Sequence, residues 1–176
     1  MGCQVTTALK SLLRQDPDVI LIGEMRDMET ISAALTAAET GHLVLATLHS
    51  NDAIQAIDRI VDVFPSHQQS QARSQLASSI LGIVSQRLLP AKVGGDRLAI
   101  FEILVGNAAI RNLIRENKLH QVQSIMEGGR RDGMITLDRA LKEAYENGLI
   151  HWDDAQRYLQ NPKLISPPEG GNGFSR

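Results

Sequence analysis

The chain has 176 residues, of which 43% are apolar and 22% charged, ordinary values for one globular domain or slightly more. A net charge of −2 gives no general attraction to nucleic acid or to an anionic membrane, and the single Cys3 excludes an internal disulfide. No apolar run approaches the roughly 20 residues that a transmembrane helix needs. Aromatic residues make up only 3%, so we expect a core of Leu, Ile, Val and Ala.

The first part of the sequence alternates predicted helices and strands. A short helix is predicted over residues 7–15. Residues 19–22 form an apolar run rich in β-branched side chains, which is typical of a strand buried on both faces. A helix over residues 28–40, capped by Asp27, follows, and a second apolar strand covers residues 43–48.

A further helix is predicted to run to Val63, with Asn51 or Ser50 as its N-cap and Pro65 after its end. The order strand, helix, strand, helix is the pattern of parallel βαβ units with right-handed crossovers. The sequence therefore predicts an α/β fold with a parallel sheet.

The second part begins with a polar connector after Pro65, which leads into a helix predicted to end near Ser85. Residues 87–90 and 98–105 flank a Gly-Gly turn and predict a β-hairpin. From residue 107 onward the pattern is helical, with several short amphipathic segments.

A change in composition near Gly106 predicts a domain boundary. Residues 1–106 would form the α/β part and residues 107–162 a small all-helical domain. Residues 163–176 are rich in Pro and Gly without periodicity, and we expect this tail to be disordered.

Polar residues follow both predicted parallel strands. Glu24 and Arg26 come after the first strand, and Thr47 and His49 end the second. Because the carboxyl ends of parallel strands meet at one edge of a sheet, these side chains can converge on a ligand. Glu24 can polarise an attacking water, or it can form a structural ion pair with Arg26. His49 can contact an anion near a helix N-terminus, or it can be an ordinary structural histidine.

A phosphate-binding loop is missing from the sequence. Such a loop has the pattern G-x-x-x-x-G-K-[ST], whose backbone amides surround phosphates while the Lys neutralises them. No Gly-Lys pair occurs in the chain, and its histidines and acids show no spacing typical of a metal site. The residues alone therefore predict part of a nucleotide site, with a water-polarising acid and no cradle.

The segments IGEMRD and TGHLVLATLHSNDA resemble motifs of the secretion-motor ATPases of type IV pili and type II secretion. IGEMRD is similar to their atypical Walker B segment, in which Gly23 stands in place of the usual metal-binding Asp and Glu24 matches the catalytic glutamate. The second segment is similar to their His box, and His49 matches the histidine that approaches the γ-phosphate. The resemblance implies ATP and Mg²⁺ as ligands, with nucleotide contacts from Gly23, Arg26, Thr47 and His49.

One further motif resembles the signature of the pilus retraction ATPases within this family. It reads AIRNLIRE and comprises Ala109, Ile110, Arg111, Asn112, Leu113, Ile114, Arg115 and Glu116. Read physically, it is an amphipathic helix with Ile110, Leu113 and Ile114 inward and with Arg111, Arg115 and Glu116 outward. The alternative is an ordinary surface helix.

The resemblance implies the C-terminal part of a RecA-like P-loop NTPase core followed by a small helical domain. It also implies a hexameric motor for pilus retraction and twitching motility. The motor would be cytoplasmic and peripheral at the inner membrane, where it meets the pilus platform protein. Members of the family are longer and carry the phosphate-binding loop in a preceding half. Without that half, an open sheet edge and face would invite partners.

Three other functions stay open. The chain can be a non-catalytic interaction module of such a motor, since it lacks the cradle. A type II secretion or pilus extension ATPase is a second alternative, although its usual four-cysteine module cannot be built with Cys3 alone. Binding of nucleic acid through Arg111, Arg115, Arg130 and Arg131 is disfavoured by the net charge of −2 and by the absence of nearby stacking aromatics.

Overall fold

The computed structural model describes residue 15 and residues 17–166. It divides into two compact units that interleave along the sequence. The first comprises Met1–Ile83 and Val105–Ile125, and the second comprises Val84–Leu104 and Met126–Arg176. The domain boundary near Gly106 rests on a change in composition along the sequence, and it stays a prediction.

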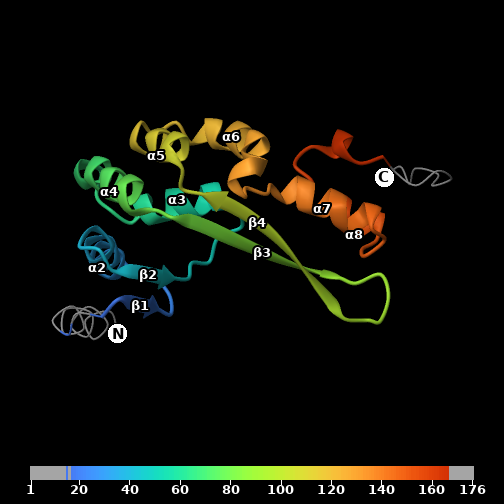
Figure 1. Ribbon diagram of the computed structural model, residues 1–176, viewed down its shortest axis with the longest axis horizontal. Helices are drawn as coiled ribbons and strands as arrows, with labels where there is room; N and C mark the ends of the chain where they lie inside the picture. The colour runs from blue at the N-terminus through green and yellow to red at the C-terminus, as the bar shows by residue number, and fades with distance from the viewer. Residues whose placement is uncertain (1–14, 16, 167–176) are drawn as a thin grey trace. The chain divides into compact units, whose positions relative to one another are not determined.

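The first unit contains the predicted parallel βαβ arrangement. Strands β1 (Val19–Ile22) and β2 (Leu43–Ala46) pair in parallel, and helix α2 (Met28–Glu39) connects them (Figure 1). Asp27 caps α2, because its Oδ1 accepts the Thr30 amide at 2.8 Å. The predicted order of strand, helix and strand is confirmed.

The two faces of this sheet differ. Ile20 and Ile22 of β1 pack against Ala34 and Ala37 of α2. The prediction of strands buried on both faces is wrong, because α2 covers one face and the residues that the structure describes leave the other open. Four aliphatic side chains are exposed there: Val19 (53%), Leu21 (74%), Leu43 (40%) and Leu45 (49%).

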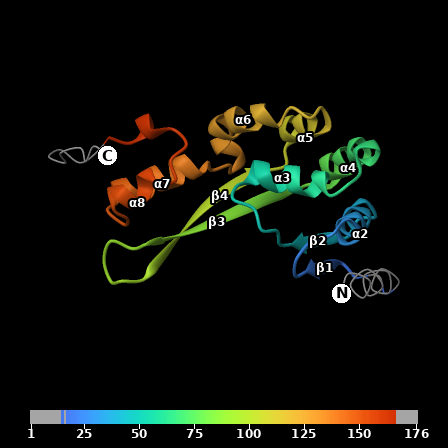
Figure 2. The ribbon, with the colours of Figure 1, turned by 180° about the vertical axis from the view of Figure 1, so that it is seen from behind.

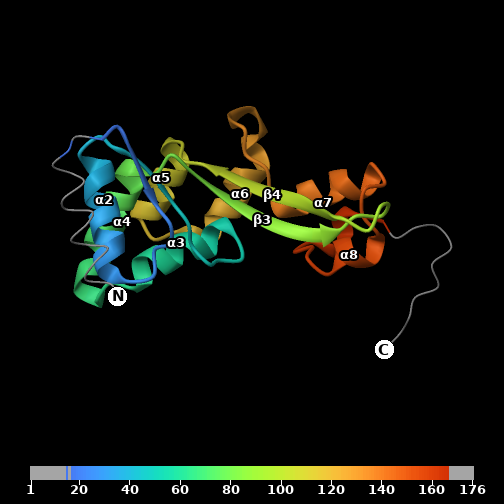
Figure 3. The ribbon, with the colours of Figure 1, turned by 90° about the horizontal axis from the view of Figure 1, so that it is seen from below.

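Two more helices complete most of the first unit. Helix α3 (Ala53–Asp62) is capped by Asp52, whose Oδ1 accepts the Gln55 amide at 2.7 Å. The predicted caps Asn51 and Ser50 are therefore wrong, because Asp52 is the residue that has the extended backbone of an N-cap. Helix α4 (Ser66–Ser79) lies beside α2, as Figure 3 shows.

Helix α4 ends at Ser79 and not near Ser85 as predicted. The residues after it, Ile80 to Val84, are mostly large and aliphatic, and they lead into strand β3 (Gly82–Pro90). The first unit then resumes with helix α5 (Ala108–Arg115) and the short 3₁₀ helix η2 (Leu119–Gln121).

The second unit is built on a β-hairpin. Strand β3 is followed by β4 (Arg97–Val105), and the two pair as a two-stranded sheet whose strands run side by side in Figure 2. The strands begin earlier than predicted, whereas the Gly94–Gly95 turn lies where expected. Leu89 and Ile100 of the hairpin form a core with residues of helices α7 (Leu137–Glu146) and α8 (Trp152–Gln156), namely Leu137, Leu141, Ala144 and Ala155.

The remaining helices are α6 (Val122–Gly128), η3 (Gly129–Asp132) and η4 (Pro162–Leu164). Because Ile165 is only 4% exposed, the prediction of a disordered tail is wrong for residues 163–165. The predicted helix over residues 7–15, except Gln15, and the tail from residue 167 lie outside the described residues. In the described part of the chain, no helix is both long and apolar enough to cross a bilayer.

Candidate active site

The ends of β1 and β2 stay together beyond the last paired residues of the strands. The Met25 amide donates to the Thr47 carbonyl at 3.0 Å. The Thr47 hydroxyl donates in turn to the Gly23 carbonyl, so two of the four predicted nucleotide-contacting residues touch each other. These contacts fix the two segments that carry Glu24 and His49.

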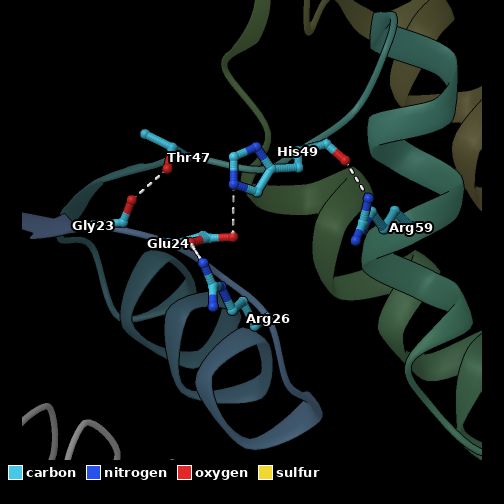
Figure 4. Close-up of polar contacts among 6 residues, drawn as sticks. All are labelled: Gly23, Glu24, Arg26, Thr47, His49 and Arg59. Carbon is cyan, nitrogen blue, oxygen red and sulfur yellow. Dashed lines mark hydrogen bonds and ion pairs between the residues drawn. The ribbon is translucent and has the colours of Figure 1, made fainter.

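Glu24 lies between two cationic or potentially cationic side chains (Figure 4). Its Oε1 is 3.1 Å from His49 Nε2, and its Oε2 is 2.5 Å from Arg26 Nη2. The Glu24 side chain is 25% exposed, whereas those of Arg26 and His49 are 74% and 79% exposed. The structure therefore brings Glu24, Arg26 and His49 together at one edge of the sheet, and the ion pair with Arg26 coexists with the contact to His49.

Charge around Glu24 favours its ionised form. The hydrogen bond from the Arg26 guanidinium lowers the pKa of Glu24 below its ordinary value of 4.5, against the opposing effect of burial. The charges of Arg26, His49 and Arg59 act in the same direction. At neutral pH this carboxylate is consequently ionised and acts as a hydrogen-bond acceptor.

Arg59 belongs to the site, although sequence reasoning did not single it out. It lies on α3, and its Nη1 donates to the main-chain carbonyl of His49 (Figure 4). The contact holds the backbone of the segment that carries the imidazole. Arg59 lies in the last turn of α3, and its partner is a main-chain atom, so no sequence pattern marked it as part of the site.

An open hollow of about 800 Å³ lies next to His49 in the first unit. Its lining includes Arg59 but also Asp58 and Asp62, and burial together with the charges of Asp62 and Asp52 raises the pKa of Asp58. The Asp52 carboxylate also accepts the hydrogen bond of the Gln55 amide at the start of α3, so this amide is not available to a phosphate. This mixed charge makes the hollow unsuitable as a cradle for a polyphosphate without additional groups.

The AIRNLIRE segment forms α5, and three of its side chains are buried as predicted: Ile110, Leu113 and Ile114. The prediction that Arg111 faces outward is wrong. Its guanidinium donates to three main-chain carbonyls, those of Gly106 at 2.7 Å, Ile80 at 2.8 Å and Ser78 at 3.0 Å.

The cause of this arrangement lies outside α5. The C-terminal end of α4 presents carbonyls that have no partner within their own helix, and a guanidinium can satisfy several of them at once. Ala109, Asn112, Arg115 and Glu116 remain exposed.

The parallel βαβ unit with an acid and a histidine at neighbouring strand ends fits part of a RecA-like ATPase domain, and comparison with solved structures shows this fold. The structure is similar to the crystal structure of the pilus retraction motor PilT with bound ADP, with a TM-score of 0.82 and 52% sequence identity. The match covers 92% of this chain and 45% of that one. A family profile described as type II/IV secretion system protein matches residues 1–157, and the chain belongs to this family.

Two curated relatives indicate which members of this family the chain resembles. The chain is 52% identical over 159 residues to a twitching motility protein of Neisseria gonorrhoeae, and 51% identical over 156 residues to the type IV pilus retraction ATPase PilT of Pseudomonas aeruginosa. These matches cover 90% and 89% of this chain, but only 42% and 45% of the relatives. The predicted resemblance to pilus retraction ATPases is confirmed, and the chain spans less than half the length of these relatives.

Proposed function

We propose that this chain carries the water-activating part of an ATP-hydrolysing motor subunit that drives type IV pilus retraction and twitching motility. The observation that carries the proposal is the 3.1 Å contact between Glu24 and His49 at adjacent strand ends. It is supported by the 51% identity to a retraction ATPase.

In the proposed reaction Glu24 orients the water that attacks the γ-phosphorus of ATP. The new bond forms between the water oxygen and phosphorus, the bond to the β,γ-bridging oxygen breaks, and the water proton passes to the carboxylate. A lowered pKa makes Glu24 a weak base. Because phosphoryl transfer depends more on positioning and charge than on proton abstraction, orientation is its main contribution.

The neighbouring residues have separate roles in this proposal. His49 exposes most of its imidazole and can donate to an oxygen of the γ-phosphate, while Arg26 holds the second oxygen of Glu24. Thr47 and Gly23 keep the strand ends in register. These residues fit the γ-phosphate of ATP and the water that attacks it.

The groups that would bind the rest of ATP and Mg²⁺ fit less well. Gly23 has no carboxylate where the common Walker B pattern has a metal-binding Asp, and its carbonyl accepts the Thr47 hydroxyl. Mg²⁺ supplies charge neutralisation when it is bound with ATP, but Gly23 offers it no carboxylate. The phosphate cradle must come from residues outside the motifs found here.

The family implies further properties that we include in the proposal. The motor would be a hexamer in the cytoplasm, at the inner membrane and in contact with the pilus platform protein. The exposed residues of the AIRNLIRE helix are the part of that motif available to a partner, namely Ala109, Asn112, Arg115 and Glu116.

A chimera tests this function. Residues 1–157 of this chain replace the matched region of the Pseudomonas aeruginosa retraction ATPase, and the product is introduced into a strain that lacks that protein. We expect ATP hydrolysis in vitro and restored twitching on agar. A folded chimera without either activity would contradict the proposal.

A second candidate is a non-catalytic interaction module, which the missing phosphate-binding pattern favours. Single-turnover ATP hydrolysis by the chimera distinguishes the two. Hydrolysis that is equally fast with Glu24→Gln favours the module, because this chain would then supply no catalytic group. Hydrolysis that Glu24→Gln abolishes while ATP binding persists favours a hydrolytic site.

A further inference from the structure

A second hollow lies within the second unit and shares no residue with the candidate active site. Its volume is about 410 Å³, and we call it the α7 hollow. It is lined by the last turn of α6, by α7 with its N-cap Thr136, and by η4 with its N-cap Asn161. The proposed reaction uses none of these residues, so the hollow has no role in it.

One wall of the α7 hollow is held in place by a buried carboxylate. Asp138 is only 7% exposed, and its two oxygens accept the amides of Gln160 and Asn161, both at 2.8 Å. These charge-assisted bonds hold the start of the η4 segment against α7, and the buried Ile165 anchors the end of that segment in the core of the unit. The hollow is therefore preformed and needs no ligand to shape it.

The side chains around the α7 hollow carry more acid than base. Four carboxylates and two cationic side chains line it, which gives a net charge of −2 at neutral pH. Both cations already lie near an acid one turn along α7: Arg139 Nε is 2.9 Å from Glu143 Oε1, and Lys142 Nζ is 3.8 Å from Glu146 Oε1. Because the second distance is long and the Glu146 side chain is 57% exposed, this carboxylate can also accept a hydrogen bond from a ligand.

Glu127 on α6 adds a carboxylate to the rim, and apolar side chains lie beside it. In the described part of the chain, no hydrogen bond or ion pair joins the Glu127 carboxylate to another residue. Met126 and Leu164 also line the hollow, and Leu164 is 37% exposed. A cationic side chain with an aliphatic stem matches both features, because the stem can cover apolar atoms while the charge meets a carboxylate.

Other classes of ligand fit the α7 hollow less well. Its negative charge disfavours phosphates and nucleotides. Among the residues that the structure describes, no group of three or more His, Cys, Asp or Glu side chains could hold a metal ion. Arginine suits the hollow better than lysine, because its planar guanidinium has five donors and can bridge carboxylates on two helices.

We propose that the α7 hollow binds an arginine side chain of a partner polypeptide. The aliphatic stem lies on Met126 and Leu164, and the guanidinium donates to Glu127 and Glu146. Charge complementarity and the preformed wall carry this inference. It goes beyond the proposed hydrolysis and does not depend on Glu24 or on a bound nucleotide.

Titration of the full 176-residue chain, followed by nuclear magnetic resonance, tests the inference. The probe is a capped peptide with one arginine between two alanines. The control peptide carries citrulline, which has the shape of arginine without its charge. We expect the arginine peptide to shift the amide signals of residues 126–127, 138–146 and 161–164, with a dissociation constant of about 1 mM or tighter. The citrulline peptide should bind at least fivefold more weakly.

Two single substitutions locate the binding. Glu127→Gln should weaken binding of the arginine peptide at least fivefold. Asp96→Asn should leave it unchanged, because it makes the same charge change at an exposed residue of the same unit that does not line the hollow. Urea unfolding of both variants should match that of the wild-type chain, so that a loss of binding is not a loss of folding.

Four results would overturn the proposal. The first three are no shift up to about 10 mM peptide, equal binding of the arginine and citrulline peptides, and equal weakening by Glu127→Gln and Asp96→Asn. The fourth is binding that appears only after residues 167–176 are removed, because the occupant of the hollow would then be a segment of this chain and not a partner.

Discussion

The Oε1 atom of Glu24 and the Nε2 atom of His49 lie 3.1 Å apart, and they join the ends of two adjacent parallel strands. The Glu24 carboxylate is thereby fixed from the side of β2 as well as by its own strand. The backbone contacts between Met25 and Thr47 support the same junction. The position of the acid thus depends on the β1–β2 pairing and on the helix that connects the two strands.

The capping of α2 by Asp27 should make stability depend on pH. The amide of Thr30 lowers the pKa of Asp27 below its ordinary value of 3.8. Because the folded-state pKa is the lower one, the stabilisation is fully present above about pH 4 and is lost as the pH falls through the folded-state pKa. Urea unfolding at pH 7 should show that Asp27→Ala costs about 1 kcal/mol.

Asp27→Asn is the matched control for this prediction. Asn is as good an N-cap as Asp but has no charge to titrate, so stability at pH 7 should be nearly retained. The contribution of residue 27 to the loss of stability at acid pH should disappear. If the Asn variant were as unstable at pH 7 as the Ala variant, residue 27 would not stabilise α2 through an N-cap hydrogen bond.

Gly106 should not tolerate a side chain. A Cβ atom at this position would lie 2.3 Å from the Ile80 carbonyl oxygen, which is main chain and cannot move aside cheaply. We expect Gly106→Ala to destabilise the chain by about 1–3 kcal/mol in urea unfolding. Gly128→Ala is the control, since a Cβ there meets nothing within 4 Å. It should be neutral, or stabilising by up to about 1 kcal/mol.

Arg111 and Arg115 lie on the same helix but should behave differently. Arg111→Ala removes three hydrogen bonds to main-chain carbonyls and should cost about 2 kcal/mol or more in urea unfolding. Arg111→Lys should recover only part of this loss, because an ammonium lacks the planar fork. Arg115→Ala should change stability by less than about 0.5 kcal/mol, since Arg115 is exposed. Equal losses for both arginines would contradict the structural role of Arg111.

The local order of the first unit could be predicted from the sequence because strong signals coincide there. The apolar run at residues 19–22 ends at Gly23, and Asp27 and Gly41 mark the ends of α2. The identity of the uncovered face of the sheet, with the exposed Val19, Leu21, Leu43 and Leu45, could not be predicted from residues 19–22 alone. An apolar run shows that a strand prefers burial, and only the structure shows which face is covered.

The contacts of Arg111 could not be predicted from the sequence for a different reason. Helical spacing places it on the polar side of α5, which is correct for an isolated helix. The carbonyls that it binds come from the end of α4 and from Gly106, and no local pattern records that approach. Arg59 was missed similarly, because its partner is a backbone atom of His49.

The central claim is that Glu24 acts on the water and not on nucleotide binding. The direct measurement compares ATP affinity and single-turnover hydrolysis in the chimera with Glu24→Gln. Asp18→Asn serves as the control, since it makes the same charge change just before the opposite end of β1. We predict that Glu24→Gln leaves ATP affinity within threefold and lowers hydrolysis at least a hundredfold, while Asp18→Asn changes neither. Hydrolysis that survives in Glu24→Gln, or that falls only in proportion to affinity, would contradict the account.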